Sequence, residues 1–243
     1  MSTPPVAATA RSTALPVGAG DPAVILAQTR ENIAVGDEII RHKLSSRVMH
    51  WTVAFSFIVL FLTGMPIWSP YFTWMGALLG GLHTCRWLHP WAGVVFAIGM
   101  LWMFIHWVAE MRLTGDDAKW LSPSKLIAYM KYPAEDPNIG KYNGGQKLLF
   151  WTSMLGVIAL FTTGFILWWP VYFGQILREL SIVVHDGVFI LFSVMIVGHI
   201  YLGSAAFPGT FQSMVRGTVM KAWARLHHPR WYREVTGDDG KHR

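Results

Sequence analysis

The sequence predicts an all-α membrane protein in which four transmembrane helices form a bundle and both termini lie in the cytoplasm. Three observations lead to this prediction. Four apolar, uncharged stretches of about 20 residues follow one another along the 243-residue chain, and about 20 residues of helix span a hydrocarbon core about 30 Å thick. Lys and Arg gather in alternate connections between these stretches, and part of the first half of the chain recurs in the second half.

The composition excludes several other classes of protein. Apolar residues make up 53% of the chain, which includes 13 Trp, and such a composition is typical of membrane proteins. The net charge of +6 comes from basic residues that flank the apolar stretches, so we expect lipid as a partner and no nucleic acid. A single cysteine, Cys85, excludes an internal disulfide and a cysteine-ligated zinc or iron–sulfur site. Histidine must therefore hold any metal.

The chain divides into three predicted parts. Residues 1–45 are rich in Ala, Pro, Thr and Gly and lack the apolar core of a signal peptide, so we expect a flexible cytoplasmic tail. Residues 46–210 form the predicted membrane domain, and residues 211–243 form a basic cytoplasmic tail. The four helices are expected at about 48–68, 90–109, 148–169 and 182–203.

The basic residues predict the orientation of the helices. Of the 20 Lys and Arg residues, 18 lie before the first helix, between the second and third, or after the fourth. The other two, Arg86 and Arg178, lie in the two remaining connections. Since cytoplasmic segments carry the excess of Lys and Arg, both termini and the middle loop are expected in the cytoplasm.

An internal repeat at an offset of 100 residues predicts a duplicated helical hairpin. The matching dipeptides include Trp51-Thr52 with Trp151-Thr152, and Thr63-Gly64 with Thr163-Gly164. Both copies start on the cytoplasmic side, so the repeats are parallel, as in some transporter folds. The copies differ at one histidine, because His50 corresponds to Phe150.

The fourth apolar stretch carries two histidines, His185 and His199. At about 100° and about 1.5 Å per residue, fourteen residues return to nearly the same side of a helix and rise roughly 21 Å. Imidazoles inside a membrane are costly and usually functional. This arrangement suits axial ligation of two haems, one near each membrane surface. The alternative is two polar residues that hydrogen-bond between helices.

Two other histidines lie at matching depths. His89 begins the second apolar stretch near the outer surface, at the depth of His185, and His50 begins the first near the cytoplasm, at the depth of His199. We therefore predict two haem b groups held by the pairs His89–His185 and His50–His199, without covalent attachment because no Cys-x-x-Cys-His is present. His106 points about 100° away from His89, so a propionate or interface contact is expected there.

Five glycines on these stretches have two possible roles. They could let a flat macrocycle approach the backbone, or they could serve close helix packing. The five are Gly64, Gly93, Gly164, Gly187 and Gly198. The remaining histidines are expected on solvated surface: His42, His83, His227, His228 and His242.

The segment 141–147 leads into the third helix and contains Asn143 and Gln146. Their amides would lie at a helix N-terminus, whose positive dipole end favours an oxygen that gains electron density. A quinone head group fits this position. A plain N-cap turn is the equally weighted alternative.

Several runs of the chain, between about residues 47 and 235, match a known family. They are His50-Trp51-Thr52, Leu88-His89-Pro90, Gly140-Lys141-Tyr142-Asn143, Gly145-Gln146-Lys147, His185, His199-Ile200-Tyr201, and His227-His228-Pro229-Arg230-Trp231-Tyr232-Arg233-Glu234. On these residues the chain resembles the gamma subunit, a b-type cytochrome, of membrane-bound respiratory formate dehydrogenases. The histidines alone would also fit the cytochrome b subunit of a nickel–iron hydrogenase or another periplasmic reductase.

The resemblance implies the same two haem pairs and a quinone site, for menaquinone or ubiquinone, at Asn143, Gly145 and Gln146. It also implies an iron–sulfur beta subunit, a molybdenum- or tungsten-containing alpha subunit and, as a possibility, a higher oligomer, in a bacterial inner membrane. This chain would pass electrons from the periplasmic beta subunit to quinone at the cytoplasmic side. It would thus be the electron-transfer and quinone-reducing subunit, with no catalytic residue for formate.

Overall fold

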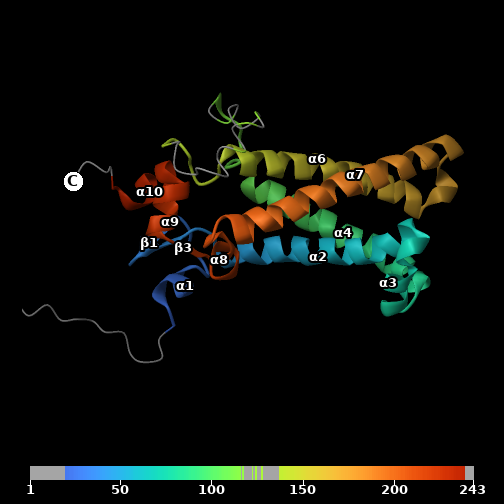
Figure 1. Cartoon of the computed structure of the whole chain (residues 1–243), viewed down its shortest axis with the longest axis horizontal. Coiled ribbons are helices and arrows are strands. Elements are labelled where there is room, and N and C mark those ends of the chain that lie inside the picture. The colour runs from blue at the N-terminus through green and yellow to red at the C-terminus, as the bar shows by residue number, and fades with distance from the viewer. Residues whose placement is uncertain are drawn as a thin grey trace, which may run out of the picture.

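Four long helices dominate the computed structural model, which describes residues 20–115, 117, 122, 124, 127 and 137–238. They are α2 (Leu44–Trp68), α4 (Leu82–Trp107), α6 (Gly144–Trp168) and α7 (Gln175–Tyr201). The four run side by side along the molecule (Figure 1). Each is long and apolar enough to cross a membrane, and the fourth span continues through the π-helical turn η4 (Leu202–Ala206). The predicted four-helix membrane fold is confirmed.

The helices begin earlier than their apolar stretches. Residue 90 was expected to start the second helix, but α4 begins at Leu82, directly after Gly81, whose φ is 97°. A helix continues through polar residues until a residue such as this glycine, whose backbone is outside the helical region, ends it. The apolar stretch marks only the part of the helix that faces lipid. His50 and His89 consequently lie inside α2 and α4 rather than at their first residues.

The helices pack in pairs, and the pairs are copies of one hairpin. The α2 helix packs against α4, the α6 helix packs against α7, and α4 joins the two pairs through α6. The bounds of α2 and α6 differ by 100 residues at both ends, and a short 3-10 turn follows each, η1 (Pro70–Phe72) and η3 (Pro170–Tyr172). The first hairpin has an additional short helix, α3 (Thr73–Leu78), in its turn. The predicted duplication is visible in the fold.

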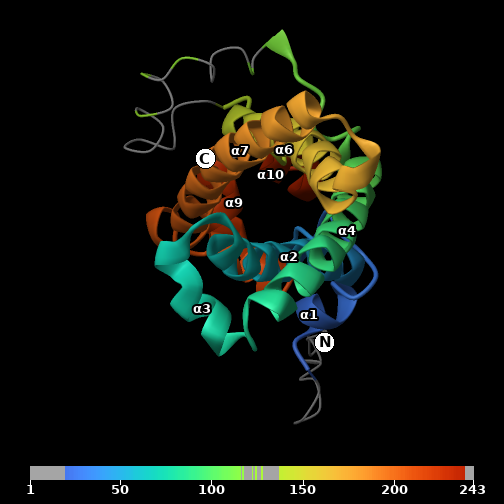
Figure 2. The ribbon, with the colours of Figure 1, turned by 90° about the vertical axis from the view of Figure 1, so that its right-hand side faces the viewer.

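An aromatic layer crosses the middle of the bundle. Phe57 of α2, Phe96 of α4 and Phe192 of α7 contact one another with ring centroids 5.5–6.2 Å apart. The view along the bundle shows α2, α4, α6 and α7 arranged around one axis (Figure 2). Phe192 lies seven residues from each α7 histidine, so this layer separates the two ends of the interior.

Both terminal segments fold into one structure at one end of the bundle. We call residues 20–43 and 216–238 the cap. Its antiparallel sheet has the order β1-β2-β3, with β1 (Ile33–Val35), β2 (Glu38–Ile40) and β3 (Thr218–Met220). The helices at this end are α1 (Pro22–Leu26), α8 (Thr210–Val215), α9 (Lys221–His227) and α10 (Pro229–Thr236).

The cap differs from the two tails that the sequence predicts. An N-terminal strand pairs there with a C-terminal strand, and local composition carries no sign of so distant a pairing. Residues 1–19 and 239–243 belong to the predicted tails and lie outside the described residues. The cap and the described ends of the connection between α4 and α6, residues 108–115 and 137–143, lie at the same end of the bundle, opposite α3 (Figure 1).

The cap has a polar and aromatic interior. Arg41 is 2% exposed, and its guanidinium carbon lies 5.1–5.6 Å from the ring centres of Tyr142, Trp223 and Trp231. Its Nη2 donates to the carbonyl of Lys141 at 2.5 Å. This arginine therefore connects the cap to the segment that leads into α6.

The prediction of solvated surface for His42, His227 and His228 was wrong. All three are buried, and the ring of His228 bonds through Nδ1 to the carbonyl of Gly140 at 2.7 Å. Burial, and next the positive charge of Arg41, lowers the pKa of His42 and of His228 well below the usual value. Both histidines are therefore neutral parts of a packed interior.

Candidate functional site

The structure brings the four predicted ligand histidines together as two pairs. His89 of α4 faces His185 of α7 at the end opposite the cap, with ring centroids 6.4 Å apart and an interplanar angle of 64°. His50 of α2 faces His199 of α7 at the cap end, at 6.2 Å and 57°. We call these the outer pair and the inner pair.

The separation of the rings fits one metal atom between them. Imidazole nitrogens bind metals such as zinc at about 2.0–2.1 Å and lie roughly 1 Å from the ring centre, so two imidazoles on opposite sides of one metal have centres roughly 6 Å apart. Both pairs show this spacing. Among the described residues, no group of three or more His, Cys, Asp or Glu side chains could hold a metal. A two-histidine site suits a metal whose other ligands come from a macrocycle, as in haem.

Both pairs connect the two hairpins across the space between α7 and the first hairpin. The closest helix partner of α7 is α6, yet His185 of α7 faces His89 of α4, and His199 of α7 faces His50 of α2. Aromatic side chains such as Phe192 bridge this gap midway between the pairs. Cofactors in helix bundles are held in this way, by side chains on facing helices.

The five glycines fall into three groups. A Cβ added to Gly64 or Gly164 would meet an imidazole of the outer pair at 3.0 or 3.3 Å. A Cβ on Gly187 or Gly198 would meet nothing within 4 Å, so neither glycine is needed for close helix packing. A Cβ on Gly93 would make only an ordinary contact. The structure therefore shows close packing against an imidazole at Gly64 and Gly164, and the macrocycle role of the glycines stays a prediction.

Sequence reasoning missed two residues that contact the outer pair. Thr63 Oγ1 lies 3.0 Å from Nδ1 of His89, and Thr163 Oγ1 lies 2.9 Å from Nδ1 of His185. Both threonines belong to the repeated Thr-Gly dipeptide, and this repeat is the feature of the sequence that could have identified them. In the inner pair, Nδ1 of His50 is buried and has no hydrogen-bond partner among the described residues.

His106 lies apart from both pairs. Its Nε2 is 3.1 Å from Oγ of Ser46, and its ring contacts Trp107. This placement agrees with the interface contact expected from its angular position on the helix.

The segment before α6 forms a capping box. The backbone N–H of Gln146 donates to Oδ1 of Asn143 at 2.9 Å, and the backbone N–H of Asn143 donates to Oε1 of Gln146 at 3.0 Å. The side-chain oxygens of Asn143 and Gln146 thus both cap the start of α6, as the N-cap alternative expects. Beside the box, Lys147 Nζ pairs with Asp117 at 2.7 Å in a small polar hollow.

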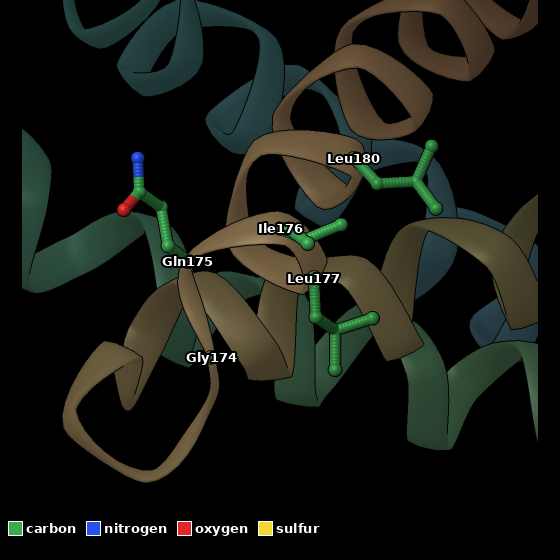
Figure 3. A pocket seen from close by; sticks show the side chains of 5 residues that line it. All are labelled: Gly174, Gln175, Ile176, Leu177 and Leu180. Carbon is green, nitrogen blue, oxygen red and sulfur yellow. The ribbon is translucent and has the colours of Figure 1, made fainter.

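A larger hollow lies at the end of the bundle opposite the capping box. It is found at the start of α7 and is lined by Gly174, Gln175, Ile176, Leu177 and Leu180 (Figure 3). Its lining is mainly apolar and contains no histidine, and Ile176 is 82% exposed. We interpret it as a surface depression beside lipid-facing side chains rather than as a cofactor site.

Four membrane-spanning helices, with two half-buried histidine pairs that connect α7 to α2 and to α4, are typical of a membrane cytochrome b. The prokaryotic cytochrome b561 family matches residues 41–217. The chain is 34% identical over 202 residues to the formate dehydrogenase cytochrome b556(fdo) subunit of Escherichia coli K12, covering 82% of this chain and 94% of the relative. The nitrate-inducible formate dehydrogenase subunit of that strain is 31% identical over 207 residues, covering 84% and 94%. The formate dehydrogenase cytochrome b556 subunit of Haemophilus influenzae is 32% identical over 200 residues, covering 81% and 83%.

The chain therefore belongs to the prokaryotic cytochrome b561 family, among the cytochrome b556 subunits of formate dehydrogenases, and it carries electrons within the membrane. The resemblance seen in the sequence is confirmed.

Proposed function

We propose that this chain is the di-haem subunit of a formate dehydrogenase complex and passes electrons from a periplasmic iron–sulfur subunit to quinone at the cytoplasmic side. One observation carries the proposal. Two facing histidine pairs, each with the spacing of a shared metal, lie at two depths along α7. Their α7 members are fourteen residues apart, roughly 21 Å along the helix, which is most of a hydrocarbon core about 30 Å thick.

Each pair has one task in this proposal. His89 and His185 hold the outer haem b, and His50 and His199 hold the inner one. A bound haem supplies an iron that gains or loses one electron. The chain contributes neutral imidazoles in a water-poor interior and sets the distance between the two sites. Electrons enter at the outer pair and leave at the inner pair.

The proposed orientation places the cap in the cytoplasm of a bacterium and the outer pair toward the periplasm. The cap and the α4–α6 loop carry most of the Lys and Arg residues, as expected of cytoplasmic segments. Electrons that move inward, toward a quinone that takes its protons from the cytoplasm, generate membrane potential. One elementary charge is worth about 2.3 kcal/mol per 100 mV.

Quinone, either menaquinone or ubiquinone, is proposed to bind at Asn143, Gly145 and Gln146. The capping box uses the side-chain oxygens of Asn143 and Gln146, so Nε2 of Gln146 is the donor that remains for a quinone oxygen. The N-terminus of α6 adds a positive dipole end, which stabilises the reduced, partly anionic forms. Binding of the quinone is therefore compatible with an intact N-cap.

Formate chemistry is assigned to a partner subunit. The relatives are named as subunits of formate dehydrogenase. We propose for this chain an iron–sulfur beta subunit and a molybdenum- or tungsten-containing alpha subunit, and association of such complexes into a higher oligomer. The chain itself serves electron transfer and quinone reduction.

Purification of the intact complex from membranes tests this function. We expect formate to reduce two protohaems per chain, and added quinone to reoxidise them. The variant His106→Ala serves as a control that keeps both haems, because His106 bonds to Ser46 and lies outside both pairs. A complex with one haem per chain, or loss of a haem in that control, would contradict the proposed pairs.

A further inference from the structure

The two copies of the Thr-Gly dipeptide contact the outer histidines in the same way. Thr63-Gly64 of α2 lies against His89, and Thr163-Gly164 of α6 lies against His185. Each threonine is buried, at 1% and 8% exposure. Each copy thus serves the helix that follows it in its own hairpin.

The threonines determine which ring nitrogen carries the proton. Thr63 Oγ1 donates its only proton to the carbonyl of Val59 at 2.7 Å, and Thr163 Oγ1 donates to the carbonyl of Ala159 at 2.7 Å. Each hydroxyl can then only accept from the imidazole, so Nδ1 carries the hydrogen. The lone pair of Nε2 in a neutral imidazole is left free to bind a metal.

The glycines fix where each ring lies. A Cβ added to Gly64 would stand 3.0 Å from Cε1 of His89, and one added to Gly164 would stand 3.3 Å from Cε1 of His185. Such contacts are tighter than nine in ten real Cβ contacts, so a larger residue would push the imidazole away by a few tenths of an ångström. Threonine therefore holds the ring by one edge while glycine leaves room for it.

The inner pair lacks this arrangement. In the part of the chain that the structure describes, the buried Nδ1 of His50 has no hydrogen-bond partner. Position 150, which corresponds to His50 in the second repeat, is Phe150. The two pairs are consequently chemically different, although their ring spacings are alike.

We propose that Thr63-Gly64 and Thr163-Gly164 are positioning pairs that hold His89 and His185 as Nδ1–H tautomers and thereby lower the reduction potential of the outer haem relative to the inner one. The inference rests on the proposed function, because it needs His89 and His185 as ligands. A hydrogen bond from Nδ1–H makes an imidazole more basic and favours the ferric form of the iron that it binds. A lower potential at the outer site favours inward electron flow.

Replacement of each threonine tests the role of its hydroxyl separately from the role of its side-chain volume. Thr63→Val and Thr163→Val keep the volume and remove the acceptor, whereas Thr63→Ser and Thr163→Ser retain it. In potentiometric titrations of the purified complex, each Val variant should change the ferric–ferrous equilibrium of the outer haem by up to about tenfold. This change is an upward shift of up to about 59 mV for one electron. The inner haem should not shift, and the Ser variants should restore the wild-type value.

Two further variants control for general damage. Thr84 also bonds to the carbonyl four residues earlier, on the outer end of α4, so Thr84→Val removes a similar bond away from both imidazoles. It should leave both potentials unchanged. Gly64→Ala should alter the electron paramagnetic resonance signal of the outer haem more than Gly164→Ala does, because its Cβ contact is shorter.

The outcomes separate this inference from the proposed function. Loss of the outer haem in the Val variants with retention in the Ser variants would support positioning. Unchanged potentials in the Val variants, equal shifts of both haems, or the same effect in the Ser variants would overturn it. If His89→Ala and His185→Ala keep the outer haem, the ligand assignment itself fails, whatever the threonine variants show.

Discussion

Acidification should loosen the cap before it affects the bundle. His42 and His228 are both buried and neutral, and burial together with Arg41 holds their pKa values well below the usual value. Below the unfolded-state pKa of about 6.5, the unfolded cap binds a proton at each histidine that the folded cap does not bind. The free energy of unfolding therefore falls as the pH is lowered through this value.

The loss of unfolding free energy can be calculated from the protonation of His42 and His228. Between pH 7.5 and 5.5, each histidine that stays neutral in the folded state lowers the free energy of unfolding by about 1.4 kcal/mol, so the pair lowers it by about 3 kcal/mol. Burial, and next the charge of Arg41, also lowers the pKa of His227, but less far than for the other two, so its smaller contribution is left out of this sum. A loss of about 3 kcal/mol is a large fraction of the stability of a small unit. Because His228 bonds to the carbonyl of Gly140, the segment that leads into α6 should loosen with the cap.

Hydrogen exchange followed by mass spectrometry on the purified complex measures this effect. Peptides from residues 216–238 should lose protection at pH 5.5, after correction for intrinsic exchange, while peptides from α4 keep theirs. His42→Leu should remove about half of the pH dependence. His83→Leu, at an exposed position of α4, is the matched control. A cap whose protection is independent of pH, or an unchanged pH dependence in His42→Leu, would refute the reasoning.

The remaining predictions concern the haems and the quinone. His89→Ala or His185→Ala should remove the outer haem and stop formate-driven reduction of the chain, as seen in reduced-minus-oxidised spectra at equal protein levels. His50→Ala or His199→Ala should spare the outer haem and leave quinone unreduced. A pyridine haemochrome assay should give two protohaems per chain, and a value near one would contradict the two pairs. Gln146→Leu should keep both haem spectra and slow reoxidation by quinone about tenfold, the effect of one lost hydrogen bond; normal reoxidation would show that this segment is only structural.

The membrane fold and the histidine pairs were predictable from local rules. Helix periodicity alone places His185 and His199 on one side of a helix, and the apolar stretches with their basic flanks set the number of spans. Depth in the membrane then leaves few partners, and the structure does bring His89 to His185 and His50 to His199. Apolar length and angular position are properties of single helices, so the sequence by itself determined them.

Only the tertiary structure revealed the cap and the surroundings of the ligands. The pairing of β2 with β3 joins residues about 180 positions apart, as in Ile39 with Val219, and no local pattern predicts so distant a contact. The roles of Thr63 and Thr163 were hidden for a related reason. A threonine inside an apolar helix usually bonds back to its own helix, as both do here, and only the packing of the neighbouring helix shows that the other side of the hydroxyl accepts from a histidine. Contacts between helices depend on how the hairpins pack in three dimensions, and the sequence specifies that packing only through the whole fold.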